Sequence, residues 1–218
     1  MTTPNLATRS TGGADETVAE WLTTNWRMLT IGAAVVAAAG GGYWLWGRQT
    51  ALKEERAEKA FAAASQIAGG GDQEKARTEL QKMVDRYNGT NAGGLGAMVL
   101  AQQLFEQDKA ADGVKVLEKA VGGAPSHLKA SMEALIASGL AQQGKEADAA
   151  ARYVRAAGQV TGAEKDGYLA DAARAYAAAG NKAEALKLWQ QLADKENSSR
   201  SIEARIRVGE LSAKVQPE

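Results

Sequence analysis

A unit of about 36 residues recurs four times behind residue 50, and this repeat constrains the fold more than any other feature of the 218-residue chain. Each unit has a turn between two helical patterns. The turn residues follow one another at spacings of 37, 36 and 36 residues: Gly71, Asp108, Gly144 and Gly180. A period of this length is typical of solenoid proteins, in which each unit is a helical hairpin that buries its apolar face against its neighbours.

Small and bulky residues occupy fixed places around each of these turns. Alanine stands seven residues before the turn in every unit, and alanine or glycine stands five residues after it. Small residues let the two helices of a hairpin approach closely, and larger residues fill the space beside that contact. An alanine-rich chain produces small-residue matches by chance, but the column nine residues after the turn is harder to explain in that way: Leu80, Leu117, Tyr153 and Trp189.

The stretch from Met28 to Trp46 contains 19 residues and no charge. As a helix it would be about 28 Å long, close to the ~30 Å hydrocarbon core of a bilayer. Aromatic and arginine side chains frame the stretch, as they do at membrane–water interfaces. The pattern predicts a single-pass transmembrane helix whose interface residues are Trp26, Arg27, Tyr43, Trp44, Trp46 and Arg48.

Two other interpretations of this stretch stay open at this point. It could be a buried helix of a soluble core, or a secretion signal cleaved after the small residues Ala37 to Ala39. The segment before it is long for a signal and carries Asp15, Glu16 and Glu20. The apolar run also continues past the cleavage site as YWLW. These features favour a retained anchor.

The chain is rich in helix-forming residues and has few alternating, strand-like runs. We therefore predict an all-α protein: one N-terminal transmembrane helix, then a tetratricopeptide-like superhelix of about four helical hairpins and a capping helix. The capping helix is expected to cover the open end of the stack with its arginines in water. Behind the anchor we expect helices at 49–68, 73–87, 93–107, 110–121, 127–142, 146–159, 164–179, 182–195 and 200–214.

This interpretation divides the chain into three parts. Residues 1–15 are expected to form a disordered tail. Residues 16–48 form a short amphipathic lead-in, opened by the capping-box pattern of Thr17 and Glu20, and the transmembrane helix. Residues 49–218 form the α-solenoid domain. The first solenoid helix is expected to run on from the anchor, because nothing near residue 50 breaks a helix.

Charge and residue usage exclude several kinds of function. The chain has 26 basic and 26 acidic side chains, so the basic excess of a nucleic-acid-binding protein is missing. It has no cysteine and a single histidine, His127, which follows Ser126, the expected cap of a helix. Glycine clusters between the helices lack the lysine of a phosphate-binding loop. We therefore predict no catalytic residue, no metal and no cofactor.

The first helix of each hairpin is expected to line a concave face, where repeat proteins bind extended segments or helices. The lysine and asparagine that hold a C-terminal carboxylate in some repeat proteins are missing from the corresponding positions here. The face is instead small and mildly polar. Its predicted partner-binding residues are Met98, Gln102, Glu106, Ser138, Gln142 and Arg174.

Two segments resemble the YfgM family, the ancillary subunits of the bacterial SecYEG translocon. They are GGGYWLWGRQ at the exit of the anchor and LGAMVLAQQLFEQDKAADGVKVLEKAV at 95–121. The resemblance implies a single-pass protein of the bacterial inner membrane, with the N-terminus in the cytoplasm and the helical domain in the periplasm. Its partners would be translocon subunits and a membrane-tethered periplasmic chaperone. A count of Lys and Arg beside the anchor favours the opposite orientation, but that rule weakens when a long domain follows.

We accordingly expect a membrane-anchored, non-enzymatic scaffold that links exported chains to periplasmic chaperones. A structural accessory subunit of another large membrane complex, respiratory or photosynthetic, is the alternative. In both cases the partners are proteins and the lipid bilayer, not nucleic acid.

Overall fold

The computed structural model describes residues 12–195 and 198–213, with side-chain surroundings from residue 20 onward. Within these residues the chain forms nine helices and no strand, which confirms the predicted all-α fold. The chain divides between Ala51 and Leu52 into two compact units. Of the tail expected to be disordered at 1–15, residues 1–11 lie outside the described residues, and residues 12–15 are helical, which differs from the prediction.

Helix α1 (Gly12–Gly69) runs without interruption through the predicted anchor. Because it begins at Gly12, Thr17 lies inside the helix and is not its N-cap, so the expected capping box does not open it. The predicted run-on from anchor to first solenoid helix is observed. The domain boundaries at residues 15 and 48 remain predictions, since the helix is continuous across both of them.

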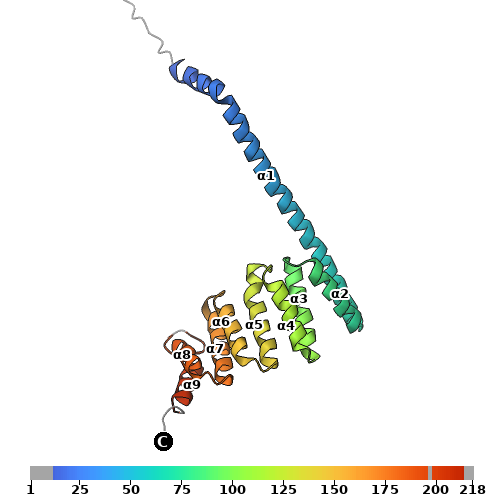
Figure 1. The fold of residues 1–218 in the computed structure, drawn as a ribbon, viewed down its shortest axis with the longest axis vertical. Helices are drawn as coiled ribbons and strands as arrows, with labels where there is room; N and C mark the ends of the chain where they lie inside the picture. The colour runs from blue at the N-terminus through green and yellow to red at the C-terminus, as the bar shows by residue number, and fades with distance from the viewer. Residues whose placement is uncertain (1–11, 196–197, 214–218) are drawn as a thin grey trace, which may run out of the picture. The chain divides into compact units, whose positions relative to one another are not determined.

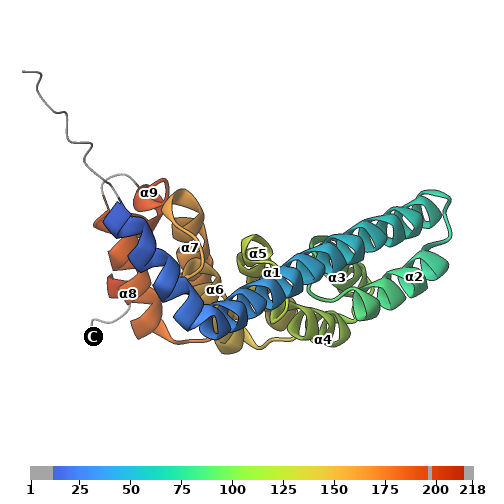
Figure 2. The same ribbon diagram turned by 90° about the horizontal axis from the view of Figure 1, so that it is seen from above.

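Eight shorter helices complete the second unit, and neighbours in sequence pack side by side (Figures 1 and 2). Each matches a predicted range to within about two residues. They are α2 (Gln73–Arg86), α3 (Asn91–Glu106), α4 (Ala110–Val121), α5 (Ser126–Gln142), α6 (Glu146–Ala157), α7 (Gly162–Ala178), α8 (Lys182–Ala193) and α9 (Ser201–Ala213).

The four predicted turn residues share one backbone conformation. Gly71, Asp108, Gly144 and Gly180 all have positive φ, between 60° and 90°. This left-handed geometry ends the first helix of each hairpin, and glycine adopts it without steric cost. Asp108 is the only non-glycine residue with positive φ among the described residues, and aspartate tolerates this region better than most side chains.

The turns of the second, third and fourth hairpins also repeat one hydrogen bond. The residue after the turn donates its backbone N–H to a carbonyl five residues earlier: Lys109 to Leu104 at 2.9 Å, and Lys145 to Leu140 at 3.0 Å. Asn181 does the same with Tyr176, at 2.8 Å. This bond satisfies a carbonyl that the helix end leaves free.

The small and bulky columns of the sequence form the core. The alanine seven residues before each turn is fully buried in all four hairpins: Ala64, Ala101, Ala137 and Ala173. In the bulky column Leu80, Leu117 and Trp189 are buried, whereas Tyr153 is half-buried. The first helices of neighbouring hairpins also contact each other; α3 and α5 are an example. The columns therefore set both the contact within a hairpin and the stacking of one hairpin on the next.

The start of α5 differs from the prediction. Ser126 is the first helical residue, the cap position belongs to Pro125, and no side chain caps this end. Proline has no N–H to satisfy, and its fixed φ suits the approach to a helix. His127 is exposed as expected, with its Nε2 3.0 Å from Asn91 Oδ1 of the preceding repeat.

Candidate functional site: a groove along the first helices

A groove of about 570 Å³ runs across the first helices of successive hairpins. The C-terminal part of α1 and helices α3, α5 and α7 contribute all but one of its lining side chains, and α6 adds the other. The lining residues are Phe61, Leu95, Met98, Val99, Gln102, Ser131, Ala134, Leu135, Ser138, Tyr153, Tyr168 and Asp171. An elongated groove built in this way suits an extended or helical segment of another protein.

One wall of the groove is an apolar strip on α3. Leu95, Met98 and Val99 follow one another at helical spacing, so they share a face. Leu95 is 37% exposed and Val99 is 40% exposed, although both lie within a helix whose opposite side is buried. Large apolar side chains left open in a concave surface are typical of protein-binding sites.

Glycines hold α3 close to its neighbours and so fix the position of this strip. A Cβ at Gly94 would come 2.7 Å from Leu128 Cδ1 of α5. A Cβ at Gly96 would come 2.8 Å from Met83 of α2. The glycine-rich start of α3 therefore serves packing between repeats, and it turns Leu95 and Val99 outward.

The opposite end of the groove is polar and carries two tyrosines. Burial, with the nearby carboxylates of Asp171 and Glu146, raises the pKa of Tyr153. Burial likewise raises the pKa of Tyr168, whose hydroxyl lies 3.4 Å from Glu164 Oε1. The Tyr153 hydroxyl therefore stays protonated at neutral pH and can donate a hydrogen bond to a bound segment, whereas the Tyr168 hydroxyl already donates to Glu164.

Three of the six predicted partner-binding residues meet in this groove. Met98, Gln102 and Ser138 line it together. Glu106 and Gln142 are exposed near the ends of α3 and α5 and do not line the groove. The structure tests none of the six for binding, so their role stays a prediction.

Arg174, the sixth predicted residue, is engaged inside the domain. Its guanidinium donates to Glu203 of α9 at 2.5 Å and to Asp171 at 2.5 Å. The same group lies over the ring of Trp189, 5.7 Å from the ring centre. These contacts tie α7 to α8 and α9, and Arg174 does not line the groove.

The repeat register itself could have found several groove residues that the sequence analysis missed. Leu95 and Ser131 each lie 13 residues before the turn of their hairpin, and Phe61 and Met98 each lie ten residues before theirs. The residue nine before the turn also faces the groove, and this column contains Val99, Leu135 and Asp171. Tyr153 could not be found in this way, because it lies on a second helix.

The predicted interface residues all lie on α1. The guanidinium of Arg27 lies 6.0 Å from the ring centre of Trp26, and that of Arg48 lies 5.4 Å from the ring centre of Trp44. Tyr43 and Trp46 are also in ring contact, with centres 6.2 Å apart. The helix is long and apolar enough to cross a membrane, and none of its apolar window is buried within the described chain.

Among the described residues no three His, Cys, Asp or Glu side chains gather as a metal site requires.

Comparisons with known proteins agree with this architecture. A family model described as a tetratricopeptide repeat-like domain matches residues 19–208. Among solved structures, the chain resembles nearly identical TPR-like repeats assigned to a kinesin light chain of Podosopora anserina. The identity is 14%, the TM-score is 0.55, and the match covers 73% of this chain and 87% of that one.

A single-substitution variant of the same repeats gives a TM-score of 0.54 at 14% identity and covers 73% of this chain and 86% of that one. Likeness at this identity shows the fold alone. No curated protein matches the chain. Because the family model spans most of the sequence, the chain belongs to the tetratricopeptide repeat-like domain family.

Proposed function

We propose that this chain is a membrane-anchored, non-enzymatic interaction protein whose repeat domain holds segments of partner proteins in the groove along α3, α5 and α7. The observation that carries the proposal is the exposure of Leu95 and Val99 on the wall of a concave groove. Domains with this fold act through such surfaces, and burial of both side chains by a bound segment would stabilise the complex.

The anchor in this proposal is the apolar part of α1. Its uncharged stretch matches the thickness of a bilayer, and tryptophan–arginine pairs lie near both of its ends. Tryptophan and arginine at these places suit the boundary between lipid and water. Together they support a single-pass helix that holds the repeat domain at the membrane surface.

The resemblance of two segments to the YfgM family supports a more specific role. In this role the protein is an ancillary translocon subunit of the bacterial inner membrane, with its N-terminus in the cytoplasm and its helical domain in the periplasm. It passes newly exported chains to periplasmic chaperones. The segment 95–121, which carries the resemblance, also provides the α3 wall of the groove.

Photo-crosslinking in intact cells tests the groove. A photoreactive amino acid at Gln102 or Ser138, both in the groove, should give adducts of defined mass with protein partners. The same amino acid at Gln190, exposed on α8 and outside the groove, is the matched control. Equal adducts from all three positions, or none from Gln102 and Ser138, would contradict the proposed binding site.

Two further measurements test the finer role. Protease added outside spheroplasts should digest residues beyond 50 if the helical domain is periplasmic, and protection would reverse the orientation. Purification in mild detergent should recover translocon components with the protein. Stoichiometric recovery of a respiratory or photosynthetic complex instead would support the accessory-subunit alternative.

A further inference from the structure

Helix α9 carries apolar side chains on two opposite faces. One face packs into the domain: Ala204 is fully buried, and Val208 and Leu211 pack against the core cluster that contains Trp189. The opposite face carries Ile202 and Ile206, which are 74% and 57% exposed. The end of a solenoid stack normally turns a polar face to water, so this outer face is unusual for a capping helix.

The outer apolar residues form a regular stripe. Ile202, Ile206, Gly209 and Ala213 follow one another at intervals of four, three and four residues. These intervals are the spacing at which one helix meets another in a coiled coil. All four residues are exposed, and at Gly209 nothing lies within 4 Å of the position of a Cβ.

Comparison with the earlier repeats shows what this face lacks. Gly209 stands 36 residues after Ala173, in the column whose alanines are fully buried in all four hairpins. In the second hairpin, the following helix covers that alanine: a Cβ at Gly113 of α4 would come 2.9 Å from the carbonyl oxygen of Ala101. Helix α9 thus occupies the place of a first helix, and no helix follows it within the described residues.

We propose that the helix that covers this face is α9 of a second copy of the same chain, packed in parallel. The charges beside the stripe support this arrangement. Arg205 and Glu210 flank it on opposite sides, five residues apart. In a parallel pair, each Arg205 faces Glu210 of the second copy. In an antiparallel pair, Glu210 would face Glu203, which Arg174 already holds, and Arg205 would face no carboxylate.

Two details of α9 fit this pairing. Arg205 is exposed and makes no ion pair with the residues that the structure describes, so it is available to a second copy. Gly209 has no side chain to hold the two helices apart. The stripe is short, and we therefore expect a reversible dimer that forms with rising concentration, not a permanent one.

Disulfide crosslinking tests the pairing cleanly, because the natural chain has no cysteine. Like residues on the stripe of a parallel pair meet each other. Gly209→Cys, in the full chain in detergent with copper phenanthroline as oxidant, should form a disulfide dimer several-fold faster than Arg207→Cys. Arg207 is the control because it is exposed on the same helix but lies off the stripe. Within one chain nothing lies within 4 Å of the Cβ position at Gly209, so the new side chain does not disturb the domain.

Charge exchange then separates specific pairing from chance collision. In the Gly209→Cys background, Arg205→Glu or Glu210→Arg alone should reduce crosslinking, and the two together should restore it. Equal rates at 207 and 209, or a double variant as defective as the single ones, would overturn the proposal. A crosslinked product in membranes whose mass is not twice that of the chain would assign this face to a different protein and would also overturn it.

Discussion

The ring of Phe105 on α3 fills the space beside Gly139 on α5, and this contact joins one repeat to the next. A Cβ at Gly139 would lie 2.5 Å from Phe105 Cζ and 2.7 Å from Val114 Cγ2. The same ring also packs against Gly113 of its own hairpin. Phe105 is 8% exposed, so the ring has no room to move outward without opening the core.

Replacement of Gly139 by alanine should therefore destabilise the domain. The added methyl group overpacks the contact with Phe105, and such changes cost about 1–3 kcal/mol of unfolding free energy. Gly167→Ala is the matched control, because Gly167 lies inside α7 with nothing within 4 Å of its Cβ position. There alanine should stabilise the helix by about 0.5–1 kcal/mol. Urea unfolding followed by circular dichroism measures both variants, and a loss of stability at 167 as large as at 139 would contradict the argument.

A carboxylate on α1 caps the start of α3. Glu54 Oε2 accepts a hydrogen bond from the Asn91 N–H, and its Oε1 accepts one from Ala92, both at 2.9 Å. The Thr90 hydroxyl accepts the next N–H, that of Gly93, at 2.9 Å. The free donors of the first turn are thus all satisfied, and a negative charge lies at the positive end of the helix.

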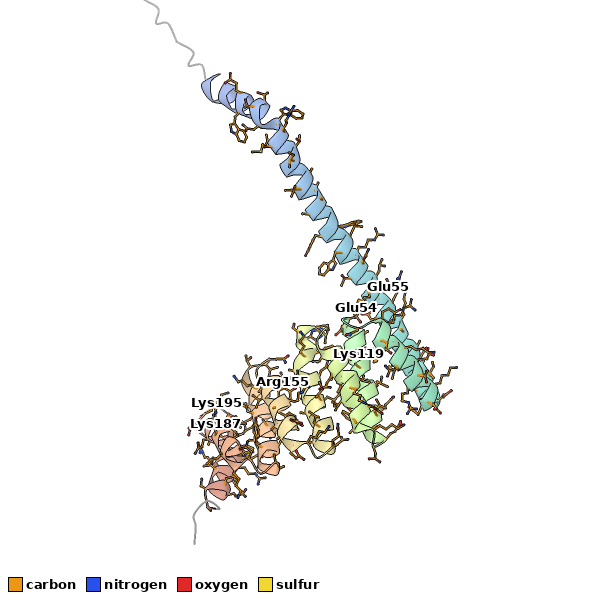
Figure 3. The ribbon with its side chains drawn as sticks, viewed as in Figure 1. Glu54, Glu55, Lys119, Arg155, Lys187 and Lys195 are labelled. Atoms are coloured by element: carbon orange, nitrogen blue, oxygen red, sulfur yellow. The ribbon has the colours of Figure 1, made fainter. Side chains whose placement is uncertain are left out.

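Glu54→Ala should lower the unfolding free energy by about 1–2 kcal/mol, because it removes two hydrogen bonds and the charge. The neighbouring Glu55, labelled beside it in Figure 3, is the control. Glu55 is exposed and pairs only with Lys59, one turn away, so Glu55→Ala should cost less than about 0.5 kcal/mol. Amide hydrogen exchange should accelerate at Asn91 and Ala92 in the first variant alone. Unchanged exchange at these two amides would show that Glu54 does not cap α3.

These two contacts mark the limit of what the sequence predicts about the fold. Helical periodicity and turn glycines are local signals, and they located the eight solenoid helices and the buried alanine columns. Glu54 and its amides are 37 and 38 residues apart, and Phe105 meets Gly139 across two helices. The periodic pattern predicts which faces of the helices pack together, but not which individual residues on another helix Glu54 and Phe105 contact. Ser126 shows the same limit at short range, because the geometry of Pro125 decided where α5 begins.

Asp166 on α7 is buried and holds the end of α8. It is 3% exposed, and Lys195 Nζ donates to its two oxygens at 2.8 and 2.9 Å. Burial raises the pKa of this carboxyl, but hydrogen bonds from Lys195 and Ser198 with the charges of Lys195 and Lys165 outweigh it. The pKa of Asp166 therefore lies below its ordinary value of 3.8.

The stabilisation from this pair should depend on pH in a defined direction. Because the folded chain binds this proton less readily than the unfolded chain, the stabilisation is complete above about pH 4 and is lost as pH falls through the lowered pKa. Lys195→Gln should cost about 1–3 kcal/mol at pH 7, since a buried carboxylate loses its cation. The difference from the natural protein should shrink as pH falls below 4 toward the lowered pKa, because a protonated Asp166 no longer needs a cation beside it.

Lys187→Gln is the control for this prediction, and Figure 3 labels both lysines. The Lys187 side chain is 74% exposed, and its Nζ lies 3.7 Å from Glu184 one turn away. Its replacement should change stability by less than about 0.5 kcal/mol at any pH. Urea unfolding of the three proteins at pH 7, 5 and 3 decides the matter. A cost at Lys195 that stays constant down to pH 3 would rule out the pair as its source.

The groove was only partly predictable for a different reason. The repeat pattern predicts which positions of a first helix usually face the concave side. Three of the residues predicted in this way, Met98, Gln102 and Ser138, do line the groove. Which inward residues stay open depends on the size of their neighbours. Arg174 does not line the groove, because its side chain contacts Glu203 and Trp189 instead. Both of these residues lie on helices that follow α7 in the chain.

Replacement of Leu95 and Val99 by serine should separate binding from folding. Both side chains are already partly exposed, so the domain should remain helical and lose only about 1 kcal/mol of stability per residue. A bound segment, in contrast, would lose two apolar contacts, and its affinity should fall about tenfold or more. Adducts from the photoreactive amino acid at Gln102 report this loss. Val154→Ser is the matched control, because Val154 is 38% exposed on α6 and lies outside the groove. Adducts that survive in the double variant, or that vanish equally in Val154→Ser, would show that the α3 strip is not the surface that partners contact.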